Sequence, residues 1–251
     1  MKNQLYRAKD RLEKALKRNR FCYWIGHRIK LGKERRLAER QNRAVQQYGL
    51  EAMRRVQEVL EAGGYRFFFS CGSLLGIVRE GGMIPHDLDL DIALEPGPDF
   101  SWEALDGLLK AAGFIRQRSF LLDGEVLEST WFYKHVGVDI YTFHREGETM
   151  VSPFFYRRSQ ERYSERWEHD FAEMVDPHYL CVEKKPVRAA DGQVFEVSVP
   201  DNYEAVLAAN YGPNWRVPDP HWDLWQAPNL RLHPGRRGKR INHCPLKSVQ
   251  P

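Results

Sequence analysis

The spacing of hydrophobic and polar residues predicts helices in the first part of this chain and strands after them. Apolar residues recur at helical spacing over about residues 36–62 and stop at Gly63-Gly64, which predicts one long helix. The run "YRFFFSC" is short and aromatic, as in a buried strand, and "SLLGIVRE" after it predicts a short helix. The segment "DLDLDIAL" alternates strictly, which is the period of a strand with one face in the core.

The middle of the chain predicts a helix and then three strands. Ser101 is suited to cap a short amphipathic helix. Strand-like runs cover about residues 114–121, 126–134 and 136–144, and the last of them contains "VGVDIYTF" with a single acid. Over about 150–180 the pattern predicts no element.

Later segments predict a hairpin and one more helix. "EKKPVRAADGQVFEVSV" predicts two strands that turn at Asp191-Gly192, and "VPDNYEAVLAANYGPNW" predicts a helix ending near Asn210–Gly212. Residues 231–251 predict a loose basic tail. Because helices precede and interrupt a run of strands with short connections, the predicted class is α+β, with a mixed β-sheet flanked by helices.

Charge divides the chain unevenly. Of the 38 Lys/Arg and 34 Asp/Glu residues, residues 1–40 hold 14 and 4, so this part is strongly basic although the net charge is only +4. Residues 3–20 predict a basic helix that breaks near the aromatic segment "RFCYWIG". We therefore expect a basic helical extension (1–35), a folded domain (36–230) and a basic tail (231–251).

The basic extension fits more than one role. Cations beside aromatic residues suit a peripheral contact with an anionic membrane surface. A solvated helix whose aromatic residues pack on the domain, or a contact between subunits, fits the same composition. No nucleic-acid partner is expected, because the sequence holds no fingerprint of a nucleic-acid-binding fold.

Composition narrows the class of protein. With 42% hydrophobic and 12% aromatic residues the chain is typical of a globular protein. No window approaches the roughly 18 apolar residues of a membrane span, and no apolar stretch follows the basic N-terminus, so neither a span nor a secretory signal is expected. The four cysteines are far apart and form no CxxC, which predicts reduced thiols and no cysteine zinc site. Reduced thiols predict a cytoplasmic location, so any peripheral membrane contact is expected at the inner face of the membrane. They are Cys22, Cys71, Cys181 and Cys244.

Three aspartates within "DLDLDIAL" are the first candidates for chemistry. On a strand Asp87, Asp89 and Asp91 point to one face and the leucines to the other. The apolar face fastens the strand to the core, while the acidic face needs water, cations or a metal. Two carboxylates at adjacent same-face positions suit Mg²⁺, a hard cation that prefers oxygen ligands. An exposed edge strand with solvated aspartates is the plainer alternative.

A third acid and a glycine complete the candidate site. Asp139 is the only acid in its strand and lies between apolar residues, where an unpaired carboxylate is costly. It can join a two-metal phosphoryl-transfer site. Gly72-Ser73 follows a predicted strand and opens a helix, so phosphate can approach the backbone amides there.

Three motifs together resemble a known family. "GSLLGIVREGGMIPHDLDLDIAL" resembles the signature of the LicD and fukutin-type branch of the nucleotidyltransferase fold. "VGVDIYTF" is similar to the later acidic strand of that family, and "VPDNYEAVLAANYGPNW" to its downstream Tyr- and Trp-containing segment. The resemblance covers about residues 50–216. It implies a nucleotidyltransferase-like sheet, with residues 1–35 outside it.

The resemblance also assigns roles by position. His86 stands where the family usually has Trp, and Leu88 where it usually has a second Asp; both leave the Asp-x-Asp pair intact, and both can alter the substrate pocket. The matching positions imply metal binding and catalysis by Asp89, Asp91 and Asp139, and substrate binding by Gly72, Ser73 and Arg79.

The family implies a Mg²⁺- or Mn²⁺-dependent phosphotransferase. It would move phosphocholine, ribitol phosphate or glycerol phosphate from a CDP-activated donor to a hydroxyl of a glycan or glycolipid, as in lipopolysaccharide or capsule synthesis. Transfer of AMP or UMP on the same fold is an alternative, and a non-catalytic binding protein is another. The donor alcohol and the acceptor glycan stay open.

Several further residues have two interpretations each. Lys134 and His135 end a strand near Asp139, and either can contact phosphate. His86 can contact the acceptor or the second metal. Arg79 binds phosphate or pairs with Glu80 at the surface. Either sugar stacking or core packing fits Trp215, Trp222 and Trp225.

Overall fold

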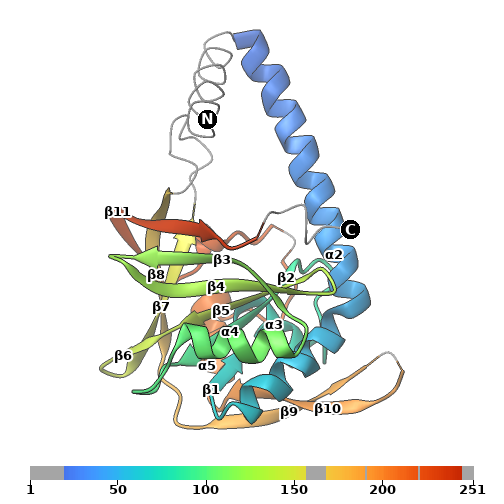
Figure 1. Ribbon diagram of the computed structural model, residues 1–251, viewed down its shortest axis with the longest axis vertical. Coiled ribbons are helices and arrows are strands. Elements are labelled where there is room, and N and C mark those ends of the chain that lie inside the picture. The colour runs from blue at the N-terminus through green and yellow to red at the C-terminus, as the bar shows by residue number, and fades with distance from the viewer. Residues whose placement is uncertain (1–19, 157–167, 190, 220, 245–251) are drawn as a thin grey trace. The chain divides into compact units, whose positions relative to one another are not determined.

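The computed structural model describes residues 20–156, 168–189, 191–219 and 221–244 (Figure 1). The chain divides into two compact units, residues 1–41 and 42–251. Helix α2 (Arg20–Ala62) forms the described part of the first unit and continues into the second. The expected break at "RFCYWIG" is wrong, because a lone glycine is tolerated within a helix. Most of the basic helix expected before it lies outside the described residues.

The second unit is built on a mixed sheet of nine strands in the order β1-β2-β5-β4-β3-β11-β8-β7-β6. Only β2 and β5 pair in parallel among the described strands of this sheet; the other pairs are antiparallel. The strands are β1 (Arg66–Phe69), β2 (Asp89–Glu95), β3 (Ile115–Leu122), β4 (Glu125–Tyr133), β5 (Val136–Thr142), β6 (His144–Glu146), β7 (Thr149–Tyr156), β8 (Glu168–Pro177) and β11 (Leu230–Asn242). The predicted α+β class with a nucleotidyltransferase-like mixed sheet is confirmed.

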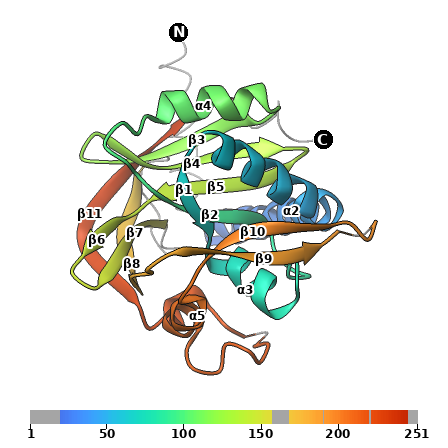
Figure 2. The ribbon, with the colours of Figure 1, turned by 90° about the horizontal axis from the view of Figure 1, so that it is seen from below.

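Helices flank the sheet, and a separate hairpin completes the unit (Figure 2). The predicted cap is present, since Ser101 Oγ accepts a hydrogen bond from the Ala104 amide at 3.3 Å. The predicted hairpin is present as a two-stranded antiparallel sheet. No helix in the described ranges has the length and apolarity to cross a bilayer. The elements are α3 (Cys71–Arg79), α4 (Trp102–Ala111), β9 (Val182–Arg188), β10 (Val194–Pro200), α5 (Tyr203–Tyr211) and the 3₁₀ helix η1 (Leu224–Gln226).

Alternation along the strands sorts side chains between an apolar and a polar face. Leu90 and Ile92 on β2 are fully buried, and each such side chain contributes roughly 1.5–3 kcal/mol when removed from water. Trp131 on β4 is also fully buried, and its Nε1 donates to Asp106 Oδ1 on α4 at 3.1 Å. Helix α4 therefore covers the apolar face. The opposite face is left to the acidic side chains.

Two expectations for the later chain are wrong. Where no element was expected over about 150–180, β7 and β8 form an antiparallel pair. The segment expected as a loose basic tail contains β11, which pairs with both β3 and β8. Pro234 and Gly235 lie within β11, and its register shifts between Leu232 and Arg237. Because its residues are mostly exposed, β11 lacks the apolar alternation of a core strand. Residues 245–251 lie outside the described ranges.

Candidate functional site

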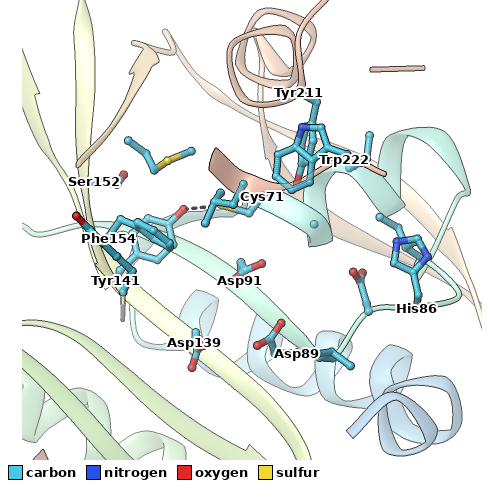
Figure 3. Close-up of a pocket in the computed structure, with 18 of the residues that line it drawn as sticks. Cys71, His86, Asp89, Asp91, Asp139, Tyr141, Ser152, Phe154, Tyr211 and Trp222 are labelled. Carbon is cyan, nitrogen blue, oxygen red and sulfur yellow. Dashed lines mark hydrogen bonds between the residues drawn. The ribbon is translucent and has the colours of Figure 1, made fainter. Parts of the chain in front are cut away.

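Strands β2 and β5 bring three predicted acids to one face of the sheet. The two strands run parallel, with Asp91 opposite Asp139 and Asp89 opposite Gly137. Partners in register point to the same side of a sheet, and so do residues two apart on one strand. Asp89, Asp91 and Asp139 therefore share a face, as Figure 3 shows.

This face forms the floor of a large pocket with a volume of about 1460 Å³. Small-molecule sites are commonly about 300–1,000 Å³, so there is room for two substrates. Figure 3 shows an aromatic wall formed by Tyr141, Phe154, Tyr211 and Trp222 around the acids. The floor is contributed by Asp87, Asp89, Asp91, Glu128, Asp139 and Arg118.

The acids on this floor are electrostatically crowded. Burial, and then the charges of Asp139 and Asp87, raise the pKa of Asp89 to about 7. Burial and the neighbouring carboxylates raise the pKa of Asp91 well above its ordinary value. Burial and Asp139 raise the pKa of Glu128 to about 8. In the described part of the chain, neither the Asp89 nor the Asp91 carboxylate accepts a hydrogen bond, so hydrogen bonding does not offset their repulsion.

The loop before β2 is fixed by polar side chains of α2 in the second unit. Asn42 Nδ2 donates to the carbonyls of Pro85 and Asp87, each at 2.9 Å, and Gln46 Nε2 donates to the Ile84 carbonyl at 3.0 Å. These bonds place His86 and Asp87 at the pocket.

Asp87 lies deeper in the site than the strand pattern suggests. A Cβ on Gly72 would lie 3.1 Å from Asp87 Oδ1, so any other residue there would require this carboxylate to shift by a few tenths of an ångström. Burial raises the pKa of Asp87 to about 6, against the opposing charges of His86 and Arg79. Its Oδ2 is buried without a hydrogen-bond partner among the described residues.

The predicted phosphate-binding residues of α3 do not all reach the pocket. Gly72 and Arg79 line it. Ser73 is buried away from it, and its Oγ accepts a hydrogen bond from the Asp91 amide at 2.9 Å, which ties α3 to β2. Arg79 also makes the alternative contact, because its Nε donates to Glu80 Oε1 at 2.8 Å.

Of two further candidates for substrate binding, His86 and Lys134, only one lies at the pocket. His86 lines the pocket, whereas Lys134 does not. Lys134 and His135 have positive φ of 47° and 69° and form the turn between β4 and β5. The Lys134 ammonium lies 2.7 Å from Glu51 Oε1 on α2. Proximity in sequence to Asp139 therefore does not bring Lys134 to the pocket, and the prediction of substrate binding by Lys134 gains no support.

The three candidate tryptophans differ in whether they line the pocket. Trp222 lines the pocket and packs on Tyr211 with ring centroids 4.7 Å apart. Trp215 lines it too but is mostly buried in the core. Trp225 packs edge-on against Tyr156 and lies outside the lining. Sugar stacking thus stays a prediction for Trp222 alone.

Two pocket residues, Glu128 and Arg118, were not identified from the sequence. Glu128 is the only acid in the strand-like run over about 126–134, which is a weaker form of the signal that identified Asp139, because a polar Ser129 follows it. Arg118 had no comparable signal, because basic residues are common on partly exposed strands. Its Nη2 lies 3.7 Å from Asp139 Oδ2.

Comparison with known proteins places this site in a family. Residues 64–175, which contain β1 through β7 and most of β8, match the family described as LicD/FKTN/FKRP, nucleotidyltransferase domain. The chain carries a LicD-family domain. The acids of β2, β4 and β5 all lie inside this LicD-family domain, whereas Tyr211 and Trp222 of the aromatic wall come from the segment after it.

Relatives of the LicD-family domain are named as transferases. The chain is 28% identical over 180 residues to ribitol 5-phosphate transferase FKRP of Homo sapiens, covering 68% of this chain and 33% of that protein. It is 24% identical over 182 residues to ribitol-5-phosphate transferase FKTN of Mus musculus, covering 71% and 35%. The chain therefore spans about a third of the length of the curated relatives it matches.

The donor set of the LicD-family domain fits a hard divalent cation. Asp139 Oδ1 is buried without a hydrogen-bond partner among the described residues, and the neighbouring acids supply oxygen ligands of the kind Mg²⁺ prefers. Within the described ranges, no group of three or more His, Cys, Asp or Glu side chains lies close enough together to hold a metal ion. Carboxylates that repel one another are expected to be spread apart in this way.

Proposed function

We propose that the protein is a Mg²⁺- or Mn²⁺-dependent phosphotransferase that moves an alditol phosphate from a CDP-activated donor to a hydroxyl of a glycan or glycolipid. The observation that carries the proposal is the acid pair Asp89 and Asp91 opposite Asp139 on a parallel strand, at the floor of a deep pocket. The names of the relatives favour ribitol phosphate over phosphocholine as the group transferred.

The acids of the floor would have two tasks. Asp89, Asp91 and Asp139 would hold the cation, which when bound neutralises the donor diphosphate and polarises its phosphoryl oxygens. Asp139 Oδ1, which has no other partner in the described residues, would accept the proton of the attacking hydroxyl. Positioning and charge neutralisation supply most of the rate in phosphoryl transfer.

Other residues of the pocket would bind and orient the substrates. The amides that open α3 at Gly72 and the Arg79 guanidinium are suited to phosphate oxygens. The aromatic wall would orient the acceptor and reduce access of water, since flat ring faces suit the apolar faces of sugars. His86 and Leu88 line the pocket where the family pattern differs, so they are the positions at which we expect donor preference to be set.

A panel of activated donors tests the proposal. The protein is incubated with CDP-ribitol, CDP-glycerol or CDP-choline, Mn²⁺ and a hydroxyl-bearing glycan, and both the nucleotide released and the mass of the glycan are measured. We expect CMP release and a glycan heavier by one alditol phosphate. Release of free alditol phosphate or phosphocholine, with addition of CMP to the glycan, would instead establish nucleotidyl transfer, and absence of both outcomes with every donor would contradict the proposal.

A further inference from the structure

One row of side chains crosses four adjacent strands at the floor of the pocket. The register places Arg118 on β3 opposite Thr130 on β4, Thr130 opposite Asp139 on β5, and Asp139 opposite Asp91 on β2. Partners in register share a face, so a guanidinium, a hydroxyl and two carboxylates stand side by side. Arg118 is therefore the basic residue of this row, and Thr130 stands between it and the two acids.

Arg118 is tethered at one nitrogen and loosely held at the others. Its Nε donates to Thr130 Oγ1 at 2.9 Å, and its guanidinium lies 5.5 Å from the Phe120 ring centroid. The 3.7 Å between Nη2 and Asp139 Oδ2 is longer than a hydrogen bond. In the described part of the chain neither Nη1 nor Nη2 donates a hydrogen bond. Both terminal nitrogens are thus available to another acceptor without breaking the tether.

The other arginine in the pocket is held differently. Arg79 donates from Nε to Glu80 at 2.8 Å and from Nη1 to the Trp215 carbonyl at 3.4 Å. The charge of Arg79 is shared between Glu80 and the pocket acid Asp87, whereas that of Arg118 opposes the raised pKa of Asp89 and of Glu128. Arg118 is therefore the counter-ion of Asp139 and of the acids beside it when no cation is bound.

A divalent cation bound at the acids would change the electrostatic interactions of Arg118. The cation takes over the neutralisation of Asp139, and it repels the guanidinium across the same few ångströms. A donor diphosphate brought in beside the cation supplies negative oxygens, and the two Nη donors match the geometry of a phosphate. A rotation about the Nε tether is enough to exchange one acceptor for the other.

We propose that Arg118 is a phosphate-binding residue, which neutralises Asp139 in the cation-free pocket and turns its Nη donors to a donor phosphate oxygen when a divalent cation replaces it. The inference rests on the proposed function for the identity of the phosphate ligand. It predicts opposite effects on two affinities: removing the guanidinium strengthens binding of the cation alone and weakens binding of a diphosphate to the cation-loaded protein.

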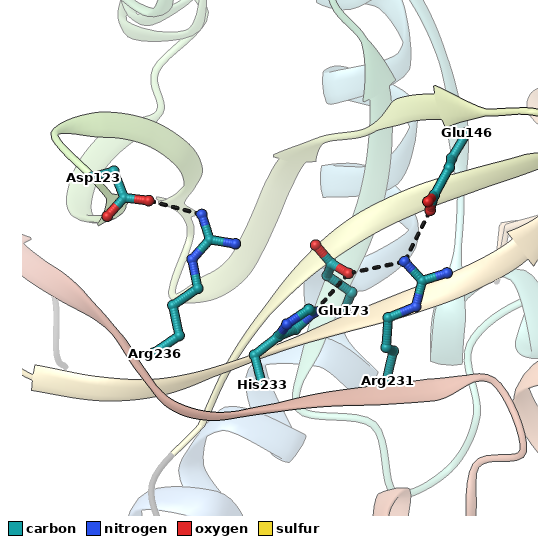
Figure 4. Close-up of polar contacts among 6 residues, drawn as sticks. All are labelled: Asp123, Glu146, Glu173, Arg231, His233 and Arg236. Carbon is teal, nitrogen blue, oxygen red and sulfur yellow. Dashed lines mark hydrogen bonds and ion pairs between the residues drawn. The ribbon is translucent and has the colours of Figure 1, made fainter.

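The experiment compares Arg118→Gln and Arg118→Lys with a matched arginine outside the pocket. Arg236 Nη2 pairs with Asp123 Oδ2 at 2.7 Å at the turn between β3 and β4, so Arg236→Gln removes an arginine–aspartate ion pair without touching the site (Figure 4). Mn²⁺ binding to the free protein and CDP binding to the Mn²⁺-loaded protein are measured by titration calorimetry. Thermal unfolding of each variant without cation checks that it is folded.

We expect Arg118→Gln to bind Mn²⁺ about 3- to 10-fold more tightly and CDP at least about 10-fold more weakly. Arg118→Lys keeps the charge without the fork, so its Mn²⁺ affinity stays near wild type while CDP binding weakens. Arg236→Gln changes neither affinity. If Arg118→Gln fails to fold, the weakened CDP binding of Arg118→Lys carries the test.

The outcomes separate this inference from the proposed function. Unchanged or weaker Mn²⁺ binding by Arg118→Gln, or unchanged CDP binding, overturns the role of Arg118 even if the wild-type protein transfers alditol phosphate. Conversely, tighter Mn²⁺ and weaker CDP binding support the role of Arg118 even if no donor in the panel is turned over, in which case the proposed function fails alone. A wild-type protein that binds no Mn²⁺ overturns both.

Discussion

Two regions of the large sheet use the same residue types with opposite electrostatic results. At one end, the β11 ion-pair cluster joins each acid to a basic or imidazole partner: Arg231 to Glu146 at 2.8 Å, His233 to Glu173 at 2.7 Å and Arg236 to Asp123 at 2.7 Å (Figure 4). On the pocket floor five acids lie near one loosely placed arginine, Arg118, whose Nη2 is 3.7 Å from Asp139 Oδ2. Matched charges hold strands together, whereas unmatched buried charges are maintained against their own repulsion and point to a ligand.

The largest effect is expected from neutralising one floor acid. Asp91→Asn should lower the proposed transfer of alditol phosphate by at least about 10²-fold, because the proposed cation site would lose a ligand. The substitution should not lower the free energy of unfolding of the cation-free protein at pH 7.5. It replaces a buried carboxyl group, whose pKa is raised because ionisation is unfavourable there, with a neutral side chain. Transfer kinetics and urea unfolding of the same preparation measure the two effects.

Two results would break the comparison here. Asp91→Asn with full activity would show that the floor acids are not needed for the reaction. A marked loss of stability with normal transfer would show that Asp91 acts as the cluster acids do.

The next effect concerns pH and the cation. The folded-state pKa of Asp89 is about 7 against an ordinary 3.8, and that of Glu128 about 8 against 4.5. A carboxyl group with a raised pKa contributes stability that is fully present below its unfolded-state pKa and is lost as the pH rises through the folded-state pKa. The cation-free protein should therefore lose stability from these groups between about pH 4 and pH 8.

Adding Mn²⁺ should recover this stability at pH 8 and do little at pH 5, because protons compete with the cation at low pH. At 100 times its dissociation constant the cation adds about 2.7 kcal/mol. The melting temperature with Mn²⁺ and after chelation, at both pH values, measures the effect. Asp89→Asn serves as the control and should respond less at pH 8; an equal response would place the cation elsewhere.

A smaller effect is expected in the cluster. Glu173 is mostly buried and accepts contacts from both Arg231 and His233, at 3.3 and 2.7 Å. Glu173→Gln should lower the free energy of unfolding, because Arg231 loses its counter-charge and His233 loses the carboxylate oxygen that it contacts, and it should leave transfer unchanged. Chemical unfolding and the donor assay provide the two measurements. Loss of transfer without loss of stability would mean that the cluster contributes to the site.

The smallest effect is expected at the exposed end of the cluster. Arg236→Gln should change the free energy of unfolding by less than about 1 kcal/mol, because the pair with Asp123 is screened by solvent. The change should become smaller at high salt, which a urea titration in low and high NaCl would test. A larger, salt-independent loss would show that this pair is part of the fixed structure.

Sequence alone could predict the parts of the site that one segment contains. The parity of Asp89 and Asp91 follows from strand alternation, and Asp139 stood out as a lone acid among apolar residues. Glu128 and Arg118 reach the site only through the strand order β5-β4-β3, which no local pattern encodes.

Lys134 and β11 show the same limit of local sequence patterns. Lys134 is close to Asp139 along the chain, but it lies in a turn beyond the strand end, where it pairs with Glu51. Strand β11 was not predicted because charged residues, Pro234 and Gly235 replace the usual alternation. Its place in the sheet depends on partners that lie more than 50 residues away in sequence.

The position of β11 has a consequence for synthesis on the ribosome. Strands β1 to β5 and strands β6 to β8 are made first, yet in the finished sheet the last strand lies between β3 and β8. A nascent chain that has emerged only as far as β10 has two sheet fragments whose facing edges are unpaired, and Phe154 and Tyr156 of the pocket wall belong to the smaller fragment. During translation the half of the sheet that carries the pocket acids can thus form early, while the complete pocket has to wait until β11 has been made.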